Sequence, residues 1–267
     1  MSTEYTFSIV TVTFNAEDTI EETIGSIIRQ DYKNFEIILV DGLSTDRTVS
    51  RAQTVLEESG IFYRILVEKD SGIFDAMNKG VAVSNGKWLL FINSGDELYD
   101  RNTLSSLMPR LSGGRGYYYG GVNIRYSNRE SFSAYPSARI NYSFGMGFCH
   151  QGMIISAALL KKQPYSMQYK LAADYCFVLW CESNNITYEY IPLLVATITS
   201  GGISDDKRGM VIDEWISCLK KFNRYYYANA IYFFLFRMYI RIVGFAKRVL
   251  SPGQYHWLVR LKNLFVR

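Results

Sequence analysis

Acidic and polar side chains follow the apolar runs in the first hundred residues. The clearest case is FINSGDELYD (91–100), where an apolar run breaks at a Ser-Gly pair and Asp96 and Glu97 come next. Unpaired carboxylates are costly to bury, so acids at the end of a buried strand indicate a ligand that needs them. Asp96 is a candidate for binding a divalent cation through oxygen, and Glu97 is expected to point away.

Three earlier apolar runs end in the same way. Thr13 and Asn15 follow the first run, Asp41 the second and Glu68 the third. Ligands of parallel α/β sheets bind at the carboxyl ends of the strands, so we expect these side chains to converge there with Asp96. Each of them alone is also typical of an ordinary strand or turn residue. Their occurrence together favours a ligand site.

The elements that would position these residues alternate along the chain. The apolar runs are FSIVTVTF (7–14), FEIILVD (35–41), FYRILVE (62–68) and KWLLFIN (87–93). Helical periods follow the first three runs, over about 16–30, after a capping cluster at 44–46, and over 73–84. This alternation predicts a Rossmann-like α/β fold, with a mostly parallel central sheet flanked by helices.

Composition limits the class of protein. A chain of 267 residues with 48% hydrophobic residues can bury one large core and is not disordered. The start, MSTEYTFSIV, lacks the basic region and cleavage site of a signal peptide. No Cys-x-x-Cys spacing occurs among the four cysteines, which are Cys149, Cys176, Cys181 and Cys218. We therefore expect a cytoplasmic protein with reduced thiols and no structural zinc site.

The sequence lacks the two common glycine-rich loops that bind the phosphates of a nucleotide. The first run leads into FNAEDTI, without the G-x-G-x-x-G of dinucleotide-binding domains, and no G-x-x-x-x-G-K-[ST] loop occurs. A diphosphate in the crevice would therefore need a cation and basic side chains. Lys79 and a divalent metal at Asp96 are the candidates.

Two segments, 9–48 (from IVTVTFNAEDTI to STDRT) and 69–99 (from KDSGIFDAMNKG to NSGDELY), together resemble the family 2 glycosyltransferases. Within that family they are most similar to the bacterial polysaccharide-assembly branch, over about residues 7–205. The resemblance implies the GT-A fold, a nucleotide-sugar donor and inversion at the anomeric carbon. We expect a transferase domain over 1–205, with a donor half to about residue 100 and an acceptor half from 101.

The resemblance also implies roles for donor-side residues. Asp96 stands in the family's acidic metal motif, but Asn93 and Gly95 replace its other acids. Asp96 alone would then bind Mn²⁺ or Mg²⁺, weakly in the absence of donor. The donor nucleotide would contact Thr13, Phe14, Asn15, Asp41, Asp75, Asn78, Lys79 and Asn93. Asp41 can accept from uracil or guanine alike, so UDP is expected only because it is frequent in the family.

Acceptor-side residues follow from two later stretches. Asp174 in YKLAADYCFVLW (169–180) matches the family's general base, near the start of a predicted helix. His150 and Gln151 in FCHQGMIIS (148–156) match the same branch and would contact the donor or acceptor sugar. A structural role is the alternative for the histidine. TSGGIS (199–204) is expected to form a loop that closes over the donor.

The C-terminal part of the chain differs in charge from the rest. Residues 1–214 hold 19 Lys and Arg against 25 Asp and Glu, whereas 215–267 hold 10 Lys and Arg and no acid. Arg237, Arg241 and Arg248 fall on one stripe of a helix, among aromatic and aliphatic residues. The pattern over 206–267 is typical of an amphipathic helix lying on anionic lipid. A helix packed on the core with a basic edge is the alternative. The acid-lined crevice argues against nucleic acid.

These expectations combine into one function. The protein would be an inverting glycosyltransferase that moves a sugar from a nucleotide donor to a polyprenyl-diphosphate-linked saccharide, in O-antigen, capsule or exopolysaccharide assembly. It would be attached peripherally to the inner membrane. One alternative is a nucleotidyltransferase acting on sugar phosphates, although the glycine-rich basic loop typical of that class does not follow the first run. The other is a non-catalytic, membrane-docked nucleotide-sugar-binding protein.

Overall fold

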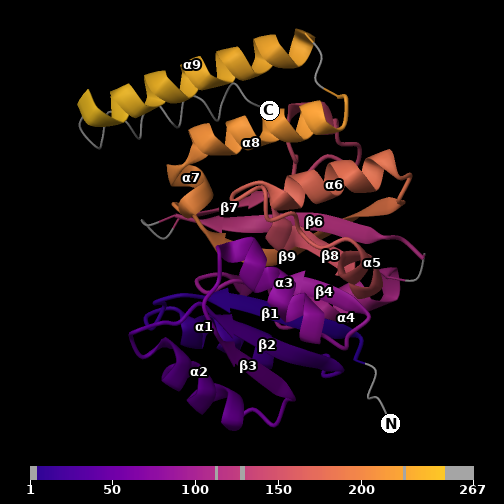
Figure 1. Cartoon of the computed structure of the whole chain (residues 1–267). Helices are drawn as coiled ribbons and strands as arrows, with labels where there is room; N and C mark the ends of the chain where they lie inside the picture. The colour runs from indigo at the N-terminus through magenta and orange to yellow at the C-terminus, as the bar shows by residue number, and fades with distance from the viewer. Residues whose placement is uncertain (1–4, 112–113, 127–129, 225–226, 250–267) are drawn as a thin grey trace.

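A nine-stranded mixed sheet with helices on both faces forms the centre of the protein (Figure 1). The computed structural model describes residues 5–111, 114–126, 130–224 and 227–249. The strand order is β3-β2-β1-β4-β8-β6-β9-β5, and β7 pairs with β6 beside that path.

The first half of the sheet is parallel throughout. It consists of β1 (Phe7–Thr13), β2 (Phe35–Asp41), β3 (Tyr63–Val67) and β4 (Trp88–Phe91). Every residue of β1 and β2 is buried, because helices cover both faces of these central strands. The predicted α/β fold with a mostly parallel sheet is therefore confirmed.

The second half of the sheet is mixed. It consists of β5 (Glu97–Leu98), β6 (Tyr117–Arg125), β7 (Ser131–Ala134), β8 (Met153–Ser156) and β9 (Tyr188–Thr199). β8 runs antiparallel to both β4 and β6, whereas β6 and β9 are parallel. β5 begins directly after Asp96 and pairs with the end of β9, so this acid lies where the two halves of the sheet meet.

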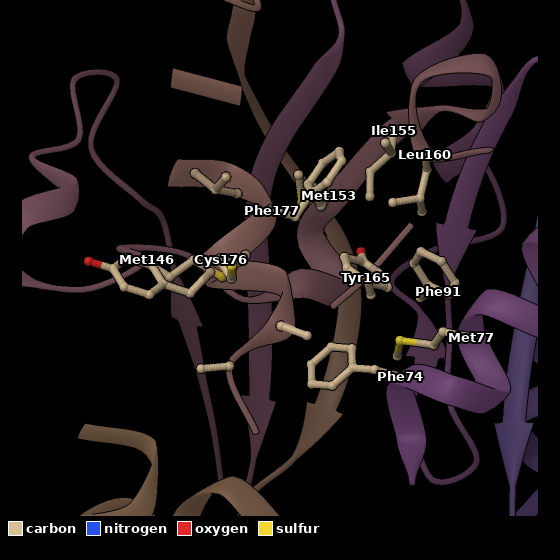
Figure 2. Close-up of a cluster of buried hydrophobic side chains, with 14 of the residues drawn as sticks. Phe74, Met77, Phe91, Met146, Met153, Ile155, Leu160, Tyr165, Cys176 and Phe177 are labelled. Carbon is tan, nitrogen blue, oxygen red and sulfur yellow. The ribbon is translucent and has the colours of Figure 1, made fainter. Parts of the chain in front are cut away.

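Two apolar cores lie on opposite faces of the sheet. Ile9 of β1 packs with α1 (Ile20–Ile28), α2 (Thr48–Glu57) and α4 (Thr103–Leu107), which η1 (Met108–Arg110) follows. Val10, on the opposite side of β1, packs with α3 (Ile73–Val83), α5 (Ala157–Lys162), α6 (Ala173–Ser183) and the C-terminal helices. In this second core Tyr165 lies among Phe74, Phe91 and Phe177 (Figure 2), with ring centroids 5.2 to 5.8 Å apart.

The starts of the first two helices can be compared with the sequence-based expectation. α2 begins at Thr48, just after the 44–46 cluster, and the Asp46 carboxylate of that cluster accepts from the Thr48 backbone N–H at 3.0 Å. α1 begins at Ile20 rather than near Ala16, whose carbonyl oxygen accepts from Thr19 and Ile20 in a turn. The start of α1 therefore lies four residues later than expected, whereas α2 follows its expected capping cluster.

The C-terminal helices belong to the second core. α7 (Ile203–Asp206) leads into α8 (Arg208–Lys221) and α9 (Tyr227–Val249), and Ile212, Leu219 and Phe233 are buried in that core. Arg237, expected to face lipid together with Arg241 and Arg248, instead pairs with Asp213 of α8. Arg241 is exposed, and the Arg248 side chain lies outside the described residues. Over the described ranges, no helix combines the length and the apolar character needed to span a bilayer.

Close packing of α3 on the sheet requires a glycine. A Cβ at Gly80 would lie 2.5 Å from Val10 Cγ1 and 3.2 Å from Val40 Cγ2, and valine side chains are stiff. We expect Gly80→Ala to lower the free energy of unfolding by about 1–3 kcal/mol, despite the better helix propensity of alanine. Urea denaturation would measure this change.

The matched control is Gly209→Ala in α8, where no atom lies within 4 Å of the added Cβ. Its free energy of unfolding should be unchanged or raised by up to about 1 kcal/mol. Equal effects of the two substitutions would contradict the close approach of α3.

Candidate active site

The carboxyl ends of β1, β2 and β4 lie side by side. Thr13 and Asp41 are register partners at the ends of β1 and β2. The Ser94 backbone N–H donates to the Val12 carbonyl at 3.1 Å, which draws the segment after β4 to the end of β1. The structure thus places Thr13, Asp41 and the 93–96 segment along one edge of the sheet.

The loops after β1 and β2 bind each other. Asp41 is fully buried, and its two oxygens accept from the Ser44 backbone N–H at 2.7 Å and the Ser44 hydroxyl at 2.5 Å. Asn15, at φ +47°, accepts from the Thr45 backbone N–H at 2.9 Å. This arrangement leaves Phe14 62% exposed beside the edge. Phe14 is therefore not a core aromatic, and its exposed ring is available for stacking on a base.

Asp70 is an additional acid near this edge that the sequence argument did not single out. A Cβ at Gly42 would lie 2.5 Å from Asp70 Oδ2 and 3.5 Å from the Phe14 ring. Asp70 is only partly buried, and its Oδ1 accepts from the Gly72 backbone N–H at 2.9 Å. The segment KDSG containing it was visible in the sequence, but nothing in its spacing showed that Asp70 would lie against Gly42.

The polar side chains of α3 form hydrogen bonds and ion pairs with other parts of the protein. Lys79 Nζ donates to the Lys69 carbonyl at 2.6 Å and lies 3.7 Å from the carboxylates of both Glu68 and Asp75. Asn78 exchanges two hydrogen bonds with the backbone of Tyr165, at 2.9 and 3.0 Å. Lys79 is therefore the basic side chain of this helix beside the edge, and Asn78 joins α3 to the segment before α6.

Asp96 is a buried carboxylate held by neutral donors. Gln151 Nε2 donates to its Oδ2 at 2.9 Å, and the Thr199 backbone N–H also donates to it. Burial raises the pKa of Asp96 to about 6, and these hydrogen bonds oppose the rise. Glu97 pairs with Arg125 of β6 at 2.7 Å, so the two neighbouring acids have different partners.

His150 lies between Asn93 and Asp174. It begins η3 (His150–Gly152), a short turn that also contains Gln151. The Asn93 side-chain nitrogen lies 3.1 Å from His150 Nε2, and His150 Nδ1 lies 3.7 Å from Asp174 Oδ2. Burial lowers the pKa of His150 to about 4, which keeps its ring neutral. This one turn therefore contacts both buried acids, Asp174 through His150 and Asp96 through Gln151.

Asp174 lies in the first turn of α6, near the helix start that the sequence predicted. Burial raises its pKa to about 6, and Glu214 of α8 adds to the rise. The Glu214 carboxylate accepts from the backbone N–H groups of three residues before the helix, Lys170, Leu171 and Ala172, at 2.8 to 2.9 Å. Glu214 thus fixes the start of α6. It was missed because its role arises only when α8 packs on α6.

Three buried polar atoms near these residues have no hydrogen-bond partner within the described part of the chain. They are Thr13 Oγ1, Asn93 Oδ1 and the Tyr165 hydroxyl. Nearly all buried polar groups in proteins are satisfied. A polar ligand or water beside these three segments would satisfy the unpaired atoms.

The loop expected over 199–204 is shorter than predicted. β9 ends at Thr199 and α7 begins at Ile203, with Gly201 at φ +92° between them. Closure of this loop over a donor stays a prediction.

Solved structures with a similar fold define the class of protein. A mannosyltransferase from Pyrobaculum calidifontis, in complex with GDP-Man and Mn²⁺, has a TM-score of 0.67 at 14% identity, covering 99% of this chain and 81% of that one. S. aureus TarS 1-349 in complex with UDP-GlcNAc has a TM-score of 0.60 at 19% identity, covering 80% of this chain and 66% of that one. The chain thus has the GT-A fold of nucleotide-sugar transferases.

The family follows from sequence comparison. The family model Glycosyl transferase family 2 matches residues 8–164, so the chain belongs to this family and is an inverting glycosyltransferase. The PGL/p-HBAD biosynthesis glycosyltransferase of Mycobacterium bovis is 33% identical over 204 residues, which are 74% of this chain and 79% of the relative. The Escherichia coli glucosyltransferase WfgD is 28% identical over 192 residues, 69% of this chain and 73% of the relative. The expected family is confirmed, against nucleotidyltransferase and non-catalytic alternatives.

The tautomer of His150 is a direct test of this geometry. A carboxylate beside Nδ1 favours a proton there, so Nε2 should accept from the Asn93 amide. The chain has only two histidines, and His256→Gln would leave His150 alone in a long-range ¹⁵N–¹H spectrum. We expect a neutral ring protonated at Nδ1 at neutral pH.

The comparison variant for this spectrum is Asn93→Asp. A carboxylate can only accept, so Nε2 should then become protonated. A ring protonated at Nε2 in the protein with native Asn93 would contradict the assigned arrangement.

Proposed function

We propose that this glycosyltransferase moves a sugar from a uridine diphosphate donor to a saccharide linked to polyprenyl diphosphate. The observation that supports it most is the η3 turn, which joins Asp96 on the donor side to Asp174 on the acceptor side beside unpaired buried polar atoms. The relative WfgD is named as using UDP-Glc and a diphosphoundecaprenol acceptor. By analogy, the products would be repeat units of O-antigen, capsule or exopolysaccharide.

The donor nucleotide would bind along the edge formed by β1 and β2. Phe14 would stack on the base, and Thr13 and Asn15 would lie against base and ribose. We add Asp70 to Asp41 as an acid for the base edge, because Asp70 is partly exposed and lies, like the Phe14 ring, against Gly42. Lys79 would lie beside the diphosphate, with Asp75 next to it on the same helix and Asn78 joining α3 to Tyr165.

The reaction would be a single in-line displacement. The acceptor hydroxyl attacks the anomeric carbon as the bond to the diphosphate oxygen breaks, and its proton passes to Asp174. A carboxylate with a pKa of about 6 is largely ionised at neutral pH and more basic than a free aspartate. The Tyr175 backbone N–H, at 2.7 Å, would orient Asp174 beside the neutral His150 ring, and the nucleoside diphosphate would leave without a covalent intermediate.

A divalent cation would fit Asp96 only together with the donor. Among the described residues, no group of three His, Cys, Asp or Glu is placed to hold a metal. Asp96 nevertheless offers a hard oxygen ligand, and the donors recorded around it are neutral, so a cation would be favoured there. We propose that Asp96 holds Mn²⁺ or Mg²⁺ jointly with diphosphate oxygens and water. The ion would neutralise charge on the leaving diphosphate.

Metal binding should therefore depend on the nucleotide. In titration calorimetry, Mn²⁺ alone should bind with a Kd of about 1 mM or weaker, and UDP should tighten it. Asp96→Asn should abolish the tightening, whereas Glu97→Gln should preserve it because Glu97 pairs with Arg125. Tight binding of Mn²⁺ to the protein without nucleotide would contradict this proposal.

Asp174→Asn should keep donor binding and lose turnover by at least about 100-fold, since the amide cannot accept the proton. Thermal stabilisation by UDP-, GDP- and dTDP-sugars would first identify the donor. Release of nucleoside diphosphate on adding acceptor then measures turnover, which should fall as pH drops through about 6 because Asp174 and Asp96 both become protonated there.

The control for Asp174→Asn is Glu182→Gln on the same helix, whose side chain pairs with Arg224 at 2.9 Å. It should keep its turnover. If Asp174→Asn turned over at a near-native rate, Asp174 would not be the base.

The lipid-linked acceptor would require the enzyme to work at a membrane surface. We propose that the protein attaches peripherally to the cytoplasmic face of the inner membrane through its C-terminal segment. The basic, aromatic composition of residues 215–267 supports this location.

A further inference from the structure

Helix α9 lies across α8 on the side away from the sheet, as the outermost layer there (Figure 1). Three residues spaced one turn apart fix its inward face. Asn229 Nδ2 donates to the Ser143 carbonyl in η2 (Tyr142–Phe144) at 2.6 Å, Phe233 is buried, and Arg237 pairs with Asp213. These contacts set the rotation of α9 about its axis, and hence which side chains point outward.

The opposite side of α9 exposes a row of large apolar side chains. They are Ile231, Phe234, Leu235, Met238 and Ile242, whose exposed fractions are 48%, 64%, 60%, 42% and 62%. At the angular spacing of an α-helix they fall within an arc of about 100°. We call these five residues the outer face. A contiguous apolar stripe of this kind, unlike scattered apolar residues, marks an interaction surface.

Charge indicates the partner of the outer face. Residues 215–267 contain 10 Lys and Arg and no acid, and Arg241, which borders the outer face, is exposed. The partner must therefore offer apolar contact together with negative charge. A bilayer that contains anionic lipid offers both at its interfacial region.

A second copy of the chain fits this surface less well. A two-fold interface would bring two acid-free, basic segments against each other. The segment 227–242 is about 24 Å long at 1.5 Å per residue, and one stripe of it offers less than the roughly 800 Å² per partner that stable dimers bury.

We propose that the outer face of α9 docks on the surface of a bilayer containing anionic lipid, with the helix lying in the interfacial plane. The choice of a bilayer rests on the proposed lipid-linked acceptor. Docking would bring the acceptor half to the lipid, because α9 is bonded to η2 through Asn229. Beneath α9, α8 holds the start of α6 through Glu214, so the docking helix and Asp174 belong to one packed unit.

Vesicle flotation with the full chain would test the docking surface. We expect the protein to float with phosphatidylethanolamine vesicles containing phosphatidylglycerol, and more weakly with pure phosphatidylcholine. Phe234→Glu combined with Leu235→Glu should lower the partition coefficient by at least about tenfold, because charge replaces inserted apolar groups. The matched control is Phe132→Glu combined with Met210→Glu, two residues on β7 and α8 that are 59% and 53% exposed. It should stay within about twofold of the native protein.

Three results would overturn the proposal. They are failure of the native chain to float, flotation of the α9 variant equal to that of the native chain, and formation by the native chain of a dimer without lipid that the α9 substitutions dissociate. Light scattering would detect the dimer, and matching melting curves would show that both variants fold. Stabilisation by UDP, measured on the same samples, tests the donor site separately. If the native chain failed to float but UDP still stabilised it, the docking surface would be refuted and the transferase proposal would stand.

Discussion

The site depends on keeping two carboxylates buried, and among the described residues no cationic side chain pairs with either of them. Asp96 and Asp174 come from different halves of the chain, and burial raises the pKa of each to about 6. Desolvation of this kind is unfavourable unless polar partners are fixed in place. The Gln151 amide donates to Asp96, and the Tyr175 backbone N–H donates to Asp174 at 2.7 Å, while the His150 ring of the η3 turn lies 3.7 Å from Asp174. A displacement of this turn would therefore disturb the donor and acceptor sides together.

The C-terminal helices help to hold one of these acids in place. α6 presents Asp174 from its first turn, and Glu214 of α8 binds the backbone N–H groups just before that turn. α9 is joined in turn to α8 through Arg237 and to η2 through Asn229. Sequence composition suggested a membrane-associating appendage. The structure gives the segment two faces, one packed on the core beside the site and one left exposed.

The sequence predicted the features that follow from local patterns of apolar and polar residues. Continuous apolar strands identified the parallel half of the sheet, and the rule that ligands bind at strand ends led to Thr13, Asp41 and Asp96. Asp70 and Glu214 were missed because their partners, Gly42 and the 170–172 backbone, are distant in sequence and come together only on folding. Helical periodicity placed three arginines on one stripe, but it could not show that Asp213 of a neighbouring helix would pair with the first.

The departures from the family's acidic metal motif have local physical causes. Gly95 has φ +91°, where a side chain is disfavoured. Its backbone N–H donates to the Thr23 hydroxyl, and its carbonyl accepts from the Thr199 hydroxyl. Asn93 can donate to His150 Nε2, which an aspartate could not do. An acid at position 93 would accept from Nε2 instead of donating to it. Asparagine at 93 thus provides a donor for the His150 ring, and Asp96 is the one acid of the motif that this chain keeps.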